Sequence, residues 1–81
     1  MKYAVIGGSM SGLAEATIIE LKKRDFFIFA LDIRNEEREE EGTLYIKTDL
    51  TKNEDIERAR TIVEKKTDKV DFIANFSGCV I

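Results

Sequence analysis

Residues 7–14 read GGSMSGLA, and this glycine-rich stretch decides the fold because it joins two segments of different periodicity. The residues before it, 2–6, form a short apolar run that is typical of a strand buried on both faces. The residues after it, 12–24, predict an amphipathic helix. Its buried face is expected to carry Leu13, Thr17 and Leu21. The sequence therefore begins with a strand, a glycine-rich turn and a helix.

The glycine spacing in this turn is a variant of the fingerprint with which strand–turn–helix units bind dinucleotides. Gly8 permits the sharp turn, and Gly12 lets the backbone approach a phosphate group. The small Ala14 lets the helix pack closely on the strand. Free N–H groups and the dipole at the helix start favour an anion. We expect the loop to hold the pyrophosphate of a dinucleotide; the alternative is a turn that binds no ligand.

An acidic residue ends the second apolar run, residues 26–32. This residue, Asp32, follows Gly12 by 20 positions, which is where such units place the acid that binds the adenosine ribose. A carboxylate there accepts hydrogen bonds from the ribose hydroxyls and repels a 2′-phosphate, so we expect NAD rather than NADP. Arg34 is expected to have a surface role, although it could meet a phosphate. The alternative for Asp32 is a strand-end acid in water.

The rest of the chain continues the alternation of strands and helices. Residues 44–47 and 70–76 are expected as the third and fourth strands. Thr51 and Glu54 form a capping box for a second helix with Ile56, Ala59 and Val63 on one face. The charged stretch 34–42 is expected as a solvated connector, or as one or two helical turns that end at Gly42.

This order predicts an α/β fold. We expect a half-Rossmann parallel sheet of four strands in the order 3-2-1-4, with helices on both faces. Residues 1–81 are expected to form a single truncated dinucleotide-binding domain.

Composition excludes several other classes of protein. The net charge is −3 and the basic residues are scattered, which argues against a nucleic-acid partner. No apolar run approaches about 18 residues and no leader is recognisable, so we expect a cytoplasmic chain without a membrane span. Cys79 is the single cysteine and there is no histidine, so neither an internal disulfide nor a metal site is expected.

The chain resembles the short-chain dehydrogenase/reductase family, in the amino-terminal part of its Rossmann fold only. The loop is similar to the family's Thr-Gly-x-x-x-Gly-x-Gly motif, with Gly7 in place of Thr and Ala14 in place of the last Gly. Asp49-Leu50 resembles the pair that contacts adenine, and residues 75–78 (NFSG) resemble the family's Asn-Asn-Ala-Gly segment. Together with Asp32, the resemblance implies these cofactor contacts: Gly8, Ser9, Ser11, Gly12, Leu13, Asp49, Leu50, Asn75 and Gly78.

The catalytic residues of the family have no counterpart in this sequence. The family uses a Ser together with a Tyr-x-x-x-Lys motif, and neither Tyr3 nor Tyr45 is followed by Lys at that spacing. The resemblance implies hydride transfer to or from a carbonyl or alcohol in the parent protein, with this chain inactive alone. The alternative is a non-enzymatic nucleotide-binding or self-associating module.

The fourth expected strand, residues 70–76, is an edge if the chain ends at residue 81. Such an edge exposes apolar side chains and unpaired backbone groups, which invite pairing with another chain. We therefore expect a homo-oligomer, or a missing carboxy-terminal segment that covers this edge.

Overall fold

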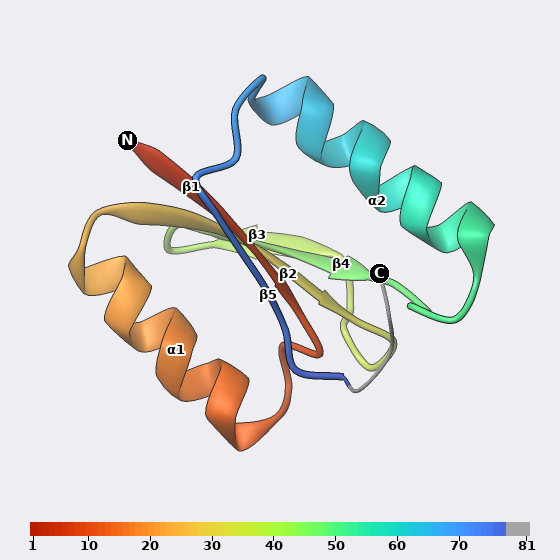
Figure 1. Ribbon diagram of the computed structural model, residues 1–81, viewed down its shortest axis with the longest axis horizontal. Coiled ribbons are helices and arrows are strands. Elements are labelled where there is room, and N and C mark those ends of the chain that lie inside the picture. Colours follow the sequence, from red (N-terminus) through yellow and green to blue (C-terminus); the bar gives the residue numbers. More distant parts are fainter. Residues whose placement is uncertain (78–81) are drawn as a thin grey trace.

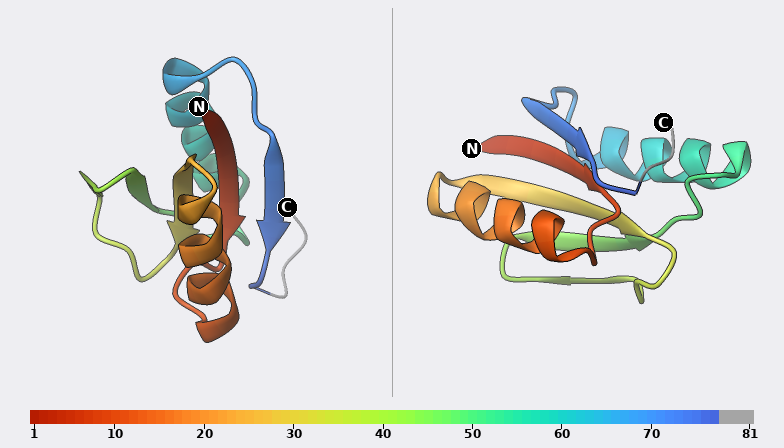
Figure 2. Two further views of the ribbon diagram at one scale, coloured as in Figure 1. Left: turned by 90° about the vertical axis from the view of Figure 1, so that its left-hand side faces the viewer. Right: turned by 60° about the horizontal axis from the view of Figure 1, so that its bottom comes forward.

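A computed structural model describes residues 1–77 as one sheet with a helix on each face (Figures 1 and 2). The strands are β1 (Lys2–Gly7), β2 (Phe26–Asp32), β3 (Arg38–Glu40), β4 (Thr43–Lys47) and β5 (Phe72–Asn75). The helices are α1 (Gly12–Lys23) and α2 (Asn53–Lys66). The strand order across the sheet is β3-β4-β2-β1-β5. The α/β class and the order of the four parallel strands agree with the prediction, but the sheet has a fifth strand and is mixed.

Alternate side chains of the strands point to opposite faces of the sheet, so each of the two helices covers a separate apolar core. Along β2, Ile28 and Ala30 pack with α1, whereas Phe27, Phe29 and Leu31 pack on the side of α2. Successive side chains of a strand point to opposite faces, so a continuous apolar run serves two cores. Strand β2 is accordingly buried almost throughout.

The stretch 34–42 is solvated as expected, apart from the buried Asn35, but it forms no helical turn and includes a strand that the sequence analysis did not predict. Strand β3 pairs antiparallel with β4, and Glu40 lies opposite Thr43 across a two-residue loop. The φ angles of Glu41 and Gly42 are 49° and 77°. Positive φ at both loop positions gives the tight turn that suits the twist of a hairpin. The guanidinium of Arg38 also lies 4.1 Å from the ring centre of Tyr45.

The buried stripe of α1 differs from the predicted one. Its buried residues are Ala14, Ile18 and Leu21, whereas Leu13 is 68% exposed. Ala14 belongs to the same buried cluster as Ala4 and Ile6 of β1, in agreement with the close packing of helix and strand that its small size predicted. Within residues 1–77, neither helix is both long and apolar enough to cross a membrane.

Candidate functional site

A hollow of about 330 Å³ lies at the carboxyl ends of the parallel strands. Ligands of open α/β sheets bind at this edge, and the volume is within the range of small-molecule sites. Five of the predicted site residues line it: Gly8, Ser11, Asp32, Asp49 and Leu50. The residues after β5, Phe76 and Ser77, line it as well. We call this space the strand-end hollow.

Gly8 makes the turn out of β1, as the sequence predicted. Its φ is 67°, a conformation that residues with side chains rarely adopt. A Cβ at Gly8 would also stand 2.6 Å from the backbone nitrogen of Ser77 and 2.9 Å from the carbonyl carbon of Phe76. The chain that follows β5 therefore leaves no room for a side chain at position 8.

The start of α1 presents unpaired backbone donors. Ser11 is the N-cap, and its Oγ accepts a hydrogen bond from the N–H of Ala14 at 3.1 Å. Within residues 1–77, the N–H groups of Gly12 and Leu13 have no hydrogen-bond partner. A Cβ built on Gly12 would meet no atom within 4 Å. This turn of helix can therefore receive an anion without rearrangement.

The carboxylate of Asp32 joins the glycine-rich loop to the end of β2. The side chain is only 5% exposed. Its Oδ2 accepts from the N–H of Met10 at 3.1 Å, and its Oδ1 accepts from the N–H of Arg34 at 2.9 Å. Both oxygens also accept from the guanidinium of Arg34, each at 3.0 Å. Arg34 thus has a role at the site that the surface interpretation missed.

These contacts explain the acidity of Asp32. The side-chain hydrogen bonds from Arg34 are the largest influence and lower the pKa, and burial opposes them. The backbone N–H groups of Arg34 and Met10 lower the pKa further, so that it falls from 3.8 to about 2. The group is therefore a carboxylate throughout the neutral range.

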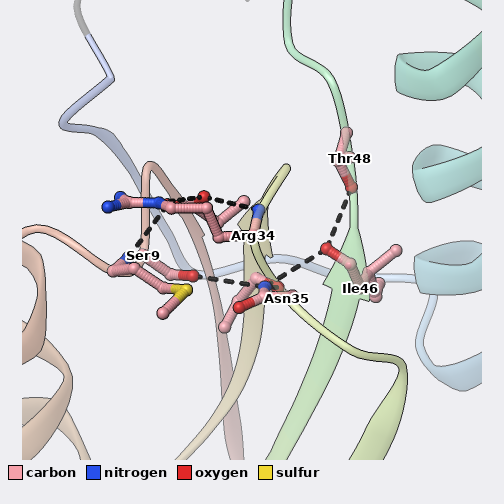
Figure 3. Close-up of polar contacts among 8 residues, drawn as sticks. Ser9, Arg34, Asn35, Ile46 and Thr48 are labelled. Carbon is pink, nitrogen blue, oxygen red and sulfur yellow. Dashed lines mark hydrogen bonds and ion pairs between the residues drawn. The ribbon is translucent and has the colours of Figure 1, made fainter.

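A buried asparagine that the sequence interpretation missed holds three segments together (Figure 3). The side-chain amide of Asn35 donates to the carbonyl of Ala30 at 2.8 Å, the carbonyl of Ile46 at 3.2 Å and the Oγ of Ser9 at 3.3 Å. Thr48 adds a hydrogen bond to the same carbonyl of Ile46 at 3.2 Å. Asn35 thereby ties the loop to the ends of β2 and β4. Ser9 is turned toward this amide and does not line the strand-end hollow.

The predicted capping box before α2 was wrong. Both the N–H and the hydroxyl of Thr51 donate to Oδ1 of Asp49, at 3.0 and 2.5 Å. The N-cap is Lys52, which makes no side-chain cap. These hydrogen bonds from Thr51 lower the pKa of Asp49, the hydroxyl contributing most. Asp55, in the first turn of α2, accepts from the backbone N–H of Asp49 at 2.8 Å.

The remaining predicted residues occupy different surroundings. Leu50 is buried among the core residues beneath α2 and only borders the hollow. Asn75 ends β5, and its Oδ1 accepts from the N–H of Ser77 at 3.0 Å. Leu13 points outward beside the exposed Gly12. Gly78 and Cys79 lie outside the described residues.

The two tyrosines have structural surroundings. The ring of Tyr3 lies 6.1 Å from that of Phe29, nearly parallel to it, and 5.9 Å from that of Phe27. Tyr45 lies beneath Arg38 on the other face. Neither ring lines the strand-end hollow.

The architecture is that of a Rossmann-type α/β unit with a hollow at its strand ends. The sequence is 28% identical to an NAD-dependent glycerol dehydrogenase of Listeria innocua, over 99% of this chain and 34% of that protein. The structure superposes with a TM-score of 0.81 and 16% identity on a short-chain dehydrogenase of Leptospira borgpetersenii solved with bound NAD⁺. That superposition covers 99% of this chain and 32% of the other.

These comparisons confirm the predicted resemblance to the short-chain dehydrogenase/reductase family. The chain spans about a third of the length of both relatives. No family model matches the sequence.

The low pKa of Asp32 predicts a specific acid sensitivity. The pKa of Asp32 is about 2 in the folded chain and 3.8 ordinarily. The carboxylate therefore contributes its full share to the free energy of unfolding above about pH 4, and this contribution is lost as the pH falls toward 2. Relative to Asp32→Asn, the wild type should gain about 2 kcal/mol in free energy of unfolding at neutral pH. Urea unfolding should show this gain fading between about pH 4 and pH 2. A gain that does not change with pH would contradict the assignment.

Proposed function

We propose that this chain binds NAD in the strand-end hollow, as the cofactor-binding portion of an NAD-dependent short-chain oxidoreductase. One observation carries the proposal: Ser11 and the buried carboxylate of Asp32 both line the hollow, and Ser11 begins the helix turn whose N–H groups at Gly12 and Leu13 are unpaired. The donors suit a pyrophosphate and the carboxylate suits ribose hydroxyls. The relatives support the choice of cofactor, since one is NAD-dependent by name and the other was solved with NAD⁺.

The residues fit this cofactor without a change in the backbone. Gly12 leaves open space where a phosphate must approach, and Ser11 and Gly8 shape the turn beside it. Asp49 and Leu50 border the other side of the hollow, where we place the adenine. We propose that Asn75 lies against the cofactor and that Ser9 supports the loop from behind through its contact with Asn35.

For the whole protein we propose hydride transfer between the nicotinamide and a carbonyl or alcohol. This 81-residue chain, a single dinucleotide-binding unit, should bind the cofactor without turning over a substrate. Neither tyrosine borders the hollow, which supports the proposal that this chain binds the cofactor without supplying a catalytic tyrosine.

Substitutions of Gly12 should change the affinity for NAD without weakening the fold. The extra methyl of Gly12→Ala has open space at a helical position, so stability should be kept or slightly raised, whereas NAD affinity should fall about ten- to a hundredfold through overlap with the pyrophosphate. Isothermal titration with NAD, NADP and ADP-ribose measures this loss, and Gly12→Asp should abolish binding by charge repulsion. Ile19→Ala, an exposed change on the same helix, is the matched control. Unchanged NAD affinity in both Gly12 variants would contradict the proposed site.

We also propose that the edge of β5 pairs with a second copy of this chain. Phe72 and Ile73 are 40% and 67% exposed on this edge strand, which supports the proposal. Sedimentation velocity at micromolar concentration should show a dimer that Ile73→Lys converts to monomer. Ile19→Lys places the same charge on a similarly exposed isoleucine of α1 and should leave the dimer intact. A monomeric wild type would overturn this proposal.

A further inference from the structure

Every acceptor position of the Asp32 carboxylate is filled by the chain itself. A carboxylate offers about four positions for hydrogen bonds, two on each oxygen. Oδ1 receives the backbone N–H and Nε of Arg34, and Oδ2 receives the backbone N–H of Met10 and a terminal nitrogen of Arg34. A ribose that binds Asp32 must therefore displace one of these donors.

The guanidinium of Arg34 is the donor that can leave. The two backbone N–H groups are held by the loop and by the turn after β2, so moving them would disturb the fold. The Arg34 side chain, in contrast, is 59% exposed and rotates about its own single bonds. Its departure would leave Asp32 with two backbone donors and two free acceptor positions.

A second hollow gives the displaced guanidinium a place to go. This hollow, of about 520 Å³, lies between α1 and the β3–β4 hairpin, and Arg34 lines both it and the strand-end hollow. Glu15 and Glu36 also line the second hollow, and so do the cationic Lys22 and Arg38. Of these charged groups, Glu15 is close enough to raise the pKa of Arg34, so its carboxylate attracts the guanidinium from the side opposite Asp32.

We propose that Arg34 is a specificity-determining residue that occupies the ribose-binding carboxylate of Asp32 and must swing out when the nucleotide binds. This inference rests on the proposed function. Two consequences follow for affinity. The wild-type chain binds NAD more weakly than its site permits, because only the fraction of molecules with Arg34 displaced is competent. A 2′-phosphate, in contrast, does not need a free acceptor on Asp32, and the guanidinium in its place beside Asp32 offsets the repulsion, so NADP is rejected less strongly than Asp32 alone would reject it.

The experiment titrates the full chain with NAD and with NADP in three variants. Arg34→Gln removes the competing guanidinium and should bind NAD about three- to tenfold more tightly, while binding NADP more weakly. Arg34→Lys keeps the charge without the two-pronged contact and should fall between wild type and Arg34→Gln. Arg24→Gln makes the same change of charge at the far end of α1, outside both hollows, and should bind both nucleotides as the wild type does. Thermal melting of each variant verifies that it is folded.

The outcomes separate this inference from the proposed function. If the wild type binds NAD and a folded Arg34→Gln binds it equally or more weakly, the competition is overturned and the proposed function stands. If Arg24→Gln raises NAD affinity as much as Arg34→Gln does, the effect is one of net charge and the inference is overturned. If neither the wild type nor any folded variant binds either nucleotide, the proposed function fails and the inference fails with it.

Discussion

The close approach of two backbone segments at Gly8 is the constraint on which the site depends. The chain leaving β5 passes so near that even a methyl group on Gly8 would overlap Ser77. This contact is possible because β1 lies in the sheet between β2 and β5, and all three strands end at the same edge. With the turn fixed there, Ser11 begins α1 at the rim of the hollow and Met10 reaches the carboxylate of Asp32.

A buried charge then completes the arrangement. Asp32 is removed from solvent, and a buried carboxylate is tolerable only when its acceptor positions are filled. The loop and Arg34 fill them, so one side chain both holds the glycine-rich turn in place and presents a binding group to the hollow. The guanidinium of Arg34 and the proposed ribose compete for the remaining acceptor positions of this carboxylate. In the proposed site, the strength of nucleotide binding depends on how easily Arg34 leaves the carboxylate, and the backbone N–H of Met10 still holds the loop after it has left.

Local patterns predicted much of this structure, and long-range contacts account for the rest. The bounds of β2 were predicted correctly from the apolar run that ends at Asp32, because the length of such a run can be read from adjacent residues. The hairpin of β3 was missed because its charged residues resemble a solvated connector, and the positive φ of Glu41 is not visible in composition. Asn35 was missed for a similar reason: its partners Ser9 and Ile46 are distant in sequence, and nothing beside it signals burial. Thr51 was assigned to a capping box, but Asp49 two residues earlier binds its hydroxyl.

Backbone amide shifts during an NAD titration test the central claim most directly. In ¹H–¹⁵N spectra of the labelled chain, the account predicts the largest changes at Met10, Gly12 and Leu13, because their N–H groups face the pyrophosphate or the Asp32 carboxylate. The apolar groove between α2 and the sheet, lined by Val70 and Ile73 among others, should change little. Changes concentrated in that groove, or no changes at millimolar NAD, would contradict the proposed binding of NAD at the start of α1 and Asp32.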